Sequence, residues 1–192
     1  MIPSKQKLRS ELRKRRRDHV AALPEQVRNL ILNRPPAPVV ELLKDTRTLG
    51  IYHPVGAEAP TLGWARWFFE NGWTLALPRF ADRDAPMEFR AWGNPWEVEG
   101  LEPGPHGGLQ PKSVCAVTVP DAIVVPLVGF TADGHRLGQG GGHYDRWIDA
   151  HPHVTPVGLA WDVQLVNELP LEPHDRTLAA VVTPTRIYWS TP

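Results

Sequence analysis

The sequence predicts an α/β fold, in which residues 1–192 form a single domain with an open, mostly parallel sheet and flanking helices in an α/β/α arrangement. Three observations lead to this expectation. The length of 192 residues suits one domain. Strand-like and helix-like stretches alternate along the chain, which is typical of βαβ units. Residues 121–130, DAIVVPLVGF, form an apolar run typical of a strand buried on both faces of a parallel sheet.

The N-terminal half is expected to begin with helices and to continue with the first strands. Ser4 can cap a helix over residues 4–23, in which leucines recur near helical spacing. Pro24 suits the first turn of a second helix over residues 24–34. The further elements expected in this half are a helix over 37–44, a strand over 48–54, an aromatic-rich helix over 59–70, and strands over 74–80 and 87–92.

The C-terminal half is expected to carry the most buried strand and a glycine-rich connection. Residues 93–120 are rich in proline and glycine, and we expect them to be mostly loop. After the buried strand over 121–130, a glycine-rich segment leads into a helix over 143–151. The last two expected strands cover residues 155–161 and 178–184.

The composition excludes several other classes of protein. Apolar residues make up 42% and charged residues 22%, which is typical of a globular chain. The longest nearly apolar stretch, residues 122–130, is far shorter than the roughly 20 residues of a membrane helix. Cys115 is the only cysteine, and the basic N-terminus lacks the apolar core of a signal peptide. We therefore expect a cytoplasmic protein with no membrane partner, and we expect it to be a monomer.

The charges are balanced in number but not in position. Residues 1–20 hold eight basic and two acidic side chains, a net charge of +6, so the rest of this formally neutral chain carries −6. A basic segment on an acidic body can bind phosphate, nucleic acid or an acidic partner. The alternative is a helix face that is simply solvated.

The most specific chemical pattern is RLGQGGGHYDR, residues 136–146. The segment follows the most buried expected strand and opens an expected helix, which is where ligands bind in open α/β sheets. Glycines let backbone N–H groups approach an anion, and a helix N-terminus adds a favourable dipole. Arg136 and Arg146 can donate to phosphate oxygens, and Asp145 can hold Mg²⁺. The segment favours a phosphate site over a purely structural turn, although it matches neither the Walker nor the dinucleotide motif.

These residues resemble the 5-formyltetrahydrofolate cyclo-ligase (5,10-methenyltetrahydrofolate synthetase) family. The hallmark of that family is a P-x-x-x-F strand end, a short glycine turn and then RLGxGGGYYDR, and this chain has PLVGF at 126–130, Asp133-Gly134 and RLGQGGGHYDR. Other segments similar to family motifs are KQKLR at 5–9, PVGAE at 54–58, LPR at 77–79, GLEP at 100–103, and the LP and HD pairs at 169–170 and 174–175. The resemblance therefore covers almost the whole chain.

The resemblance implies an ATP-dependent enzyme that converts 5-formyltetrahydrofolate to 5,10-methenyltetrahydrofolate through a phosphorylated formyl (imidate) intermediate, releasing ADP and phosphate and requiring Mg²⁺. It implies catalytic roles for Arg136 and Tyr144. The ATP-binding residues that it implies are Lys5, Arg9, Arg136, Leu137, Gly138, Gln139, Gly140, Gly141, Gly142, His143 and Tyr144, with the helix over 4–23 contributing to the ATP site. The implied folate-binding residues are His53, Glu58, Gln139, Gly140, Gly141, Gly142 and His143, and the implied Mg²⁺ ligands are Asp145 and Asp175.

Several of these residues also have plainer interpretations. His143 stands where the family usually has the first tyrosine of its YYD triplet, a change expected to affect folate affinity more than activity. The plainer interpretations are that Lys5 and Arg9 share a solvated helix face, that Glu58 caps the helix beginning near residue 59, that His53 is structural, and that Asp175 forms a turn.

Two other functions remain open at this stage. One is a relative that keeps the ATP-binding loop but acts on another formamide or a carboxylate, which the change at His143 permits. The other is a binding module whose basic helix contacts nucleic acid and whose loop is vestigial; its binding would weaken steeply with salt. The cyclo-ligase would instead need both ATP and folate, with no nucleic-acid partner.

Overall fold

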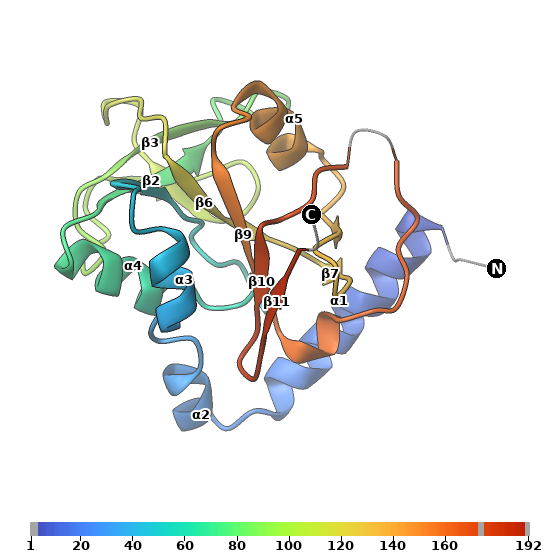
Figure 1. The fold of residues 1–192 in the computed structure, drawn as a ribbon. Coiled ribbons are helices and arrows are strands. Elements are labelled where there is room, and N and C mark those ends of the chain that lie inside the picture. Colours follow the sequence, from blue (N-terminus) through green and yellow to red (C-terminus); the bar gives the residue numbers. More distant parts are fainter. Residues whose placement is uncertain (1–3, 173–174, 191–192) are drawn as a thin grey trace.

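A seven-stranded sheet forms the middle layer of the computed structural model, which describes residues 4–172 and 175–190 (Figure 1). Its strands, in spatial order, are β11 (Ile187–Trp189), β10 (Ala180–Val182), β9 (Thr155–Leu159), β6 (Ala122–Pro126), β1 (Thr48–Gly50), β2 (Thr74–Arg79) and β3 (Glu88–Trp92). The five inner strands are parallel to their neighbours, and the edge strands β3 and β11 pair antiparallel. The expected open, mostly parallel sheet with flanking helices is confirmed.

Strand β6 is buried on both faces, as its apolar run predicts. Ala122 and Val124 face one core cluster, while Ile123 and Val125 face another. The expectation that this strand continues to residue 130 is wrong. It ends at Pro126, which has no N–H with which to donate to a neighbouring strand. The chain then leaves the sheet, and residues 129–130 pair with residues 136–137 in a separate hairpin.

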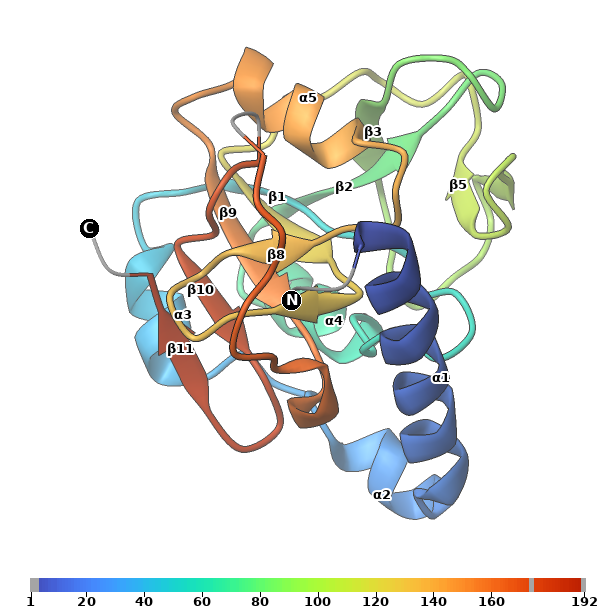
Figure 2. The same ribbon diagram turned by 90° about the vertical axis from the view of Figure 1, so that its right-hand side faces the viewer.

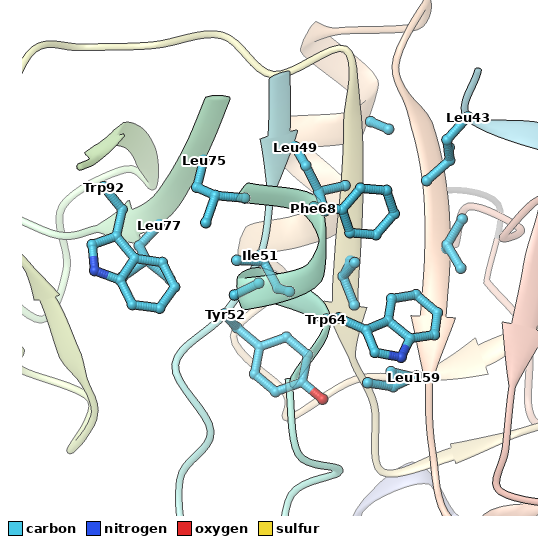
Figure 3. Close-up of a cluster of buried hydrophobic side chains, with 14 of the residues drawn as sticks. Leu43, Leu49, Ile51, Tyr52, Trp64, Phe68, Leu75, Leu77, Trp92 and Leu159 are labelled. Carbon is cyan, nitrogen blue, oxygen red and sulfur yellow. The ribbon is translucent and has the colours of Figure 1, made fainter. Parts of the chain in front are cut away.

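The aromatic-rich helix covers one face of the sheet together with the helix before it. These are α4 (Leu62–Glu70) and α3 (Ala37–Leu42). Figure 3 shows the ring of Phe68 from α4 beside Leu49 of β1, and the ring of Trp64 from the same helix beside Leu159 of β9. Full burial of a side chain such as Phe68 stabilises the fold by about 1.5–3 kcal/mol, so this contact is a main support of the sheet.

The opposite face is covered by α5 (His143–Ala150) and by a two-stranded hairpin of β7 (Gly129–Phe130) and β8 (Arg136–Leu137). Trp147 of α5 packs edge-on against Phe89 of β3, with ring centroids 4.9 Å apart. This contact holds α5 over the β2–β3 side of the sheet. The N-terminus of the helix is then free to face the carboxyl edge of the strands.

The basic N-terminal helix α1 (Lys5–Ala22) packs against this hairpin, as Figure 2 shows, and its bounds confirm the helix expected over 4–23. Ser4 caps it, since the Oγ of Ser4 accepts from the N–H of Lys7 at 3.3 Å. Its apolar side, Leu8 and Leu12, is buried against Leu137 of β8. Helix α2 (Glu25–Leu30) follows, and it ends before the expected limit at residue 34.

Short elements were the hardest to predict. Residues 93–120, expected to be mostly loop, contain a hairpin of β4 (Leu101–Pro103) and β5 (Leu109–Pro111), and the edge strand β11 was not expected. A three-residue strand is too short to show a period-two pattern, and proline at the ends of β4 and β5 hides it further. A short 3₁₀ helix, η1 (Asp162–Gln164), completes the elements described. No helix within the described ranges combines the length and apolar character needed to cross a membrane.

Candidate active site

A cavity of about 460 Å³ opens at the carboxyl edge of the parallel strands. Residues at the ends of three neighbouring strands line it: Tyr52 and His53 follow β1, Phe80 follows β2, and Pro126 ends β6. This edge is where ligands bind in open α/β sheets. The sequence predicts a ligand site at this edge, and the cavity lies there.

The glycine-rich segment forms another wall of the cavity. The segment joins β8 to α5, so it follows the small hairpin. The expectation that it directly follows the buried strand β6 is wrong. Gly140 has φ +113° and Gly142, which immediately precedes α5, has φ +62°. Residues that carry a side chain rarely adopt a positive φ of this kind, so the backbone of the loop favours glycine at both positions.

The backbone N–H groups of this loop are available to a ligand. From residue 138 to residue 145, no N–H donates to an acceptor within the described part of the chain, and the last three of these groups form the N-terminus of α5. A row of unused N–H donors beside the positive end of a helix suits an anion such as phosphate. The expected phosphate site thus has a structural basis.

Cations from α1 approach the same loop. Arg9 Nε donates to the carbonyl oxygen of Gly138 at 2.9 Å, and Arg13 Nη2 donates to that of Gln139 at 2.8 Å. Lys5, one turn before Arg9, contacts Asp175 at 2.7 Å. Lys5 and Arg9 are only partly exposed, so the interpretation that they share a solvated face is wrong.

Arg136 is buried between the loop and the C-terminal segment. Its Nη1 donates to the carbonyl oxygen of Arg176 at 2.6 Å, and its Nη2 lies 2.5 Å from Oδ1 of Asp145. Burial lowers the pKa of Arg136, whereas Asp145 and Asp175 raise it. Because a guanidinium keeps its proton in proteins, Arg136 presents a fixed positive charge to the cavity.

The two carboxylates expected to bind Mg²⁺ both lie around Arg136. Asp145 pairs with it, and Asp175 accepts from Lys5 Nζ and from the N–H of Glu172, each at 2.7 Å. Asp175 thus also holds a local turn, as its plainer interpretation suggested. Among the described residues, no group of three or more His, Cys, Asp or Glu side chains could hold a metal by itself. Mg²⁺ commonly binds one or two carboxylates together with phosphate oxygens, and this donor set fits that mode.

Glu58, in the loop after β1, also lines the cavity. Its carboxylate accepts from the N–H of Val55 and from Nε2 of Gln139, both at 2.9 Å. Burial raises the pKa of Glu58, while these two donors and Arg16 oppose the rise. Helix α4 begins only at Leu62, so the interpretation that Glu58 caps it is wrong.

Aromatic and imidazole rings complete the cavity. His143 packs against Phe80 and His106, with centroid distances of 4.8 and 5.2 Å. The pKa of His143 is lowered by burial, by Arg146 and by His106, which favours the neutral imidazole, and burial also lowers the pKa of His53. Burial raises the pKa of the Tyr144 phenol, which therefore stays a hydrogen-bond donor.

Most of the expected residues line this cavity, namely His53, Glu58, Arg136, Gly138, Gln139, Gly141, Gly142, His143, Tyr144 and Asp145. The other expected residues, Lys5, Arg9, Leu137, Gly140 and Asp175, do not line it. Lys5 and Asp175 pair with each other, Arg9 contacts the glycine-rich loop from α1, and the side chain of Leu137 is buried against α1. Tyr52, Phe80, His106 and Arg16 line the cavity but were not expected. Phe80 could have been found from its place directly after a strand, and Arg16 from its spacing of seven residues from Arg9. His106 has no such signal, because it belongs to the unexpected β4–β5 hairpin.

Comparison with known proteins gives concordant matches. The model of the 5-formyltetrahydrofolate cyclo-ligase family matches residues 1–184. The 5-formyltetrahydrofolate cyclo-ligase of Escherichia coli K12 is 44% identical over 82 residues, and this match spans only 42% of the chain and 45% of the relative's length. The enzyme of the same name from Mycolicibacterium smegmatis is 32% identical over 194 residues, covering 95% of both chains.

The fold also resembles a solved structure. The NMR structure of the 5,10-methenyltetrahydrofolate synthetase of Aquifex aeolicus superposes with a TM-score of 0.69 at 25% identity. The superposition covers 95% of this chain and 92% of that one. The sheet and its flanking layers are therefore shared over nearly the full length.

Proposed function

Because the chain belongs to the 5-formyltetrahydrofolate cyclo-ligase family, we propose that it converts 5-formyltetrahydrofolate and ATP into 5,10-methenyltetrahydrofolate, ADP and phosphate. One observation carries the proposal beyond the family relationship. A single cavity is lined by the glycine loop with its row of unused N–H donors and by Arg136, and also by Glu58 and the rings of Phe80, His106 and His143. A nucleotide phosphate and a folate can meet there.

The chemistry requires activation of the formyl group. A formamide oxygen is a weak nucleophile and a poor leaving group. Transfer of the γ-phosphoryl group of ATP to this oxygen expels ADP and produces an imidate phosphate. N10 of the folate then attacks the imidate carbon and gives up its proton to solvent. The C–O bond then breaks, and phosphate leaves with the former formyl oxygen and the electron pair of that bond. No side chain needs to form a covalent bond.

The protein contributes position and charge to the transfer, which is what phosphoryl transfer depends on. The loop N–H groups and Arg9 would hold the phosphates, and Arg136 would stabilise the charge that moves onto the bridging oxygen. Mg²⁺, when bound, would neutralise phosphate charge, and Asp145 and Asp175 are the residues that would hold it. Lys5 pairs with Asp175, whose charge also acts on Arg136.

The folate would occupy the part of the cavity beside Glu58. The Glu58 carboxylate is an acceptor for the N–H groups of a pterin ring, and Gln139 links it to the glycine loop. Tyr144 keeps its proton and would donate to the formyl oxygen, which orients that oxygen toward the phosphate end. His53 and His143 supply further walls of this half.

The proposal is tested by following product formation. Purified protein is mixed with Mg·ATP and 5-formyltetrahydrofolate, and the near-ultraviolet absorbance of the methenyl product is recorded, with ATP omitted as the control. We expect absorbance to grow only when ATP is present and to saturate in both substrates. Binding of ATP without product would show that another formamide or a carboxylate accepts the phosphoryl group. Binding of neither substrate would contradict the proposal altogether.

A further inference from the structure

Arg16 lies at the cavity but has no part in the reaction proposed above. It is the last of four basic residues, after Lys5, Arg9 and Arg13, that α1 directs toward the body of the protein. Its side chain lines the cavity together with Tyr52 and Glu58, and the residue is only 7% exposed.

The hydrogen bonding of Arg16 is incomplete. Its Nη1 donates to the carbonyl oxygen of Leu127 at 3.3 Å, but its buried Nε has no acceptor in the described part of the chain. No described carboxylate lies within 4.0 Å of its guanidinium. A buried cation without an ion pair and with an unused donor destabilises a folded protein, and such groups call for an acceptor.

The position of Arg16 indicates which ligand supplies that acceptor. Arg9 and Arg13 reach the glycine loop at residues 138 and 139, whereas Arg16, further along α1, reaches Leu127. Glu58 and Tyr52 are the groups whose charges influence the pKa of Arg16 most strongly after burial itself. Arg16 therefore lines the cavity together with Glu58 and Tyr52, and it donates to no acceptor in the glycine loop.

We propose that Arg16 is a specificity-determining residue that donates a hydrogen bond to the 4-carbonyl oxygen of the pterin, beside Glu58. This inference rests on the proposed function. The edge of a pterin presents one acceptor, the 4-oxygen, next to two donors, N3–H and the 2-amino group. A guanidinium and a carboxylate side by side are complementary to that edge, because the carboxylate has lone pairs left after its bonds to Val55 and Gln139.

The inference is tested by binding of two ligands in the absence of ATP. The ligands are 5-formyltetrahydrofolate and its 4-thioxo analogue, which keeps both N–H donors but has a poor acceptor at position 4. Their dissociation constants are measured by titration calorimetry for the wild type, Arg16→Met, Arg16→Lys and Arg17→Met. Arg17 is exposed on the same helix and serves as the matched control.

The wild type and Arg17→Met should bind 5-formyltetrahydrofolate (the oxygen ligand) at least about tenfold more tightly than its 4-thioxo analogue (the sulfur ligand). Arg16→Met should bind the oxygen ligand about 10–100-fold more weakly, with no preference left and with ATP affinity unchanged. Arg16→Lys, which keeps the charge but loses the planar fork, should retain part of the preference. Because Arg16 has no ion pair, its replacement by Met should leave Tm unchanged or raise it.

Three outcomes would overturn the inference. In the first, Arg16→Met keeps the affinity and preference of the wild type. In the second, it loses ATP affinity while folate affinity stays unchanged, so that Arg16 serves the phosphate end. In the third, both Arg16 variants unfold, which makes the residue a structural anchor of α1. In each of these outcomes the wild type still binds folate, so that only the inference about Arg16 fails. If the wild type itself binds no folate, the proposed function fails as well.

Discussion

Arg136 is the residue whose loss should affect the chemistry most. It is buried, contacts Asp145 and faces the loop that we assign to phosphate. Arg136→Met should lower kcat by about 100–1,000-fold, the cost of removing one donor that stabilises developing charge, while the protein stays folded. Arg176→Ala, which removes a neighbouring exposed guanidinium, should leave kcat within about twofold. Steady-state kinetics and circular dichroism check both variants, and a folded Arg136→Met with normal kcat would remove this residue from the mechanism.

Asp145 and Asp149 form a matched pair for testing metal binding. Both lie on α5 one turn apart, but Asp145 lines the cavity whereas Asp149 is exposed and pairs with Arg176. Asp145→Asn should raise the Mg²⁺ concentration for half-maximal activity by about 10–100-fold, because one carboxylate ligand is lost. Asp149→Asn should leave it unchanged. Equal Mg²⁺ requirements for the two variants would contradict the assignment of Asp145.

Glu58 makes the stability of the fold depend on pH. Because burial raises its pKa above the ordinary 4.5, the ionised carboxylate costs the folded state free energy. This cost is absent below the ordinary pKa and complete above the raised one. The Tm of Glu58→Gln, measured against that of the wild type, should therefore improve as the pH rises through this window. A Tm difference that does not vary with pH would show that the Glu58 pKa is not raised.

Among single residues, sequence could predict those that belong to an ordered motif. The glycine loop, Arg136, Asp145 and Glu58 were named from motifs alone, and all lie at the cavity. Arg16 and His106 were missed because neither stands in such a motif. A buried cation with an unused donor is visible only once the helix is docked, since the sequence around it reads as a solvated run of basic residues.

At the scale of elements, α1 connects the fold to the site. Its apolar residues are buried against the β7–β8 hairpin, and its basic residues reach the glycine loop. Leu12→Ala should lower the free energy of unfolding by about 2–5 kcal/mol, because Leu12 is fully buried, and should raise the KM for ATP as α1 loosens. Glu11→Ala, on the exposed side of the same turn, is the control. Denaturant unfolding and ATP kinetics check this, and a destabilised variant with an unchanged KM would show that α1 does not position the loop.

The β7–β8 hairpin is an element whose limits could not be predicted from the sequence. The apolar run over 121–130 correctly predicted burial, but apolar character continues after Pro126. Leu127 and Val128, between β6 and β7, and Phe130 of β7 are buried as well. Period and hydrophobicity cannot distinguish one long buried strand from two short ones. The break matters for the site, since it moves the glycine loop from the sheet itself onto a hairpin that α1 contacts.

For the whole molecule, topology accounts for the position of the cavity. The parallel order of β9, β6, β1 and β2 places the carboxyl ends of these strands along one edge, and α5 and α1 bring the groups that we assign to phosphate to that edge. This arrangement could be predicted from the alternation of strands and helices. The depth of the cavity could not, because it depends on the β4–β5 hairpin, which supplies His106 and Gln110 to the lining.

The central claim is that the formyl oxygen accepts a phosphoryl group and leaves as part of phosphate. The most direct measurement follows that atom. 5-Formyltetrahydrofolate labelled with ¹⁸O in the formyl group is converted with unlabelled ATP, and the released phosphate is analysed by mass spectrometry. We expect one ¹⁸O atom in the phosphate for each methenyl product formed. Methenyl product with unlabelled phosphate would show that ATP is hydrolysed by water and that the formyl oxygen is never phosphorylated, which would contradict the account.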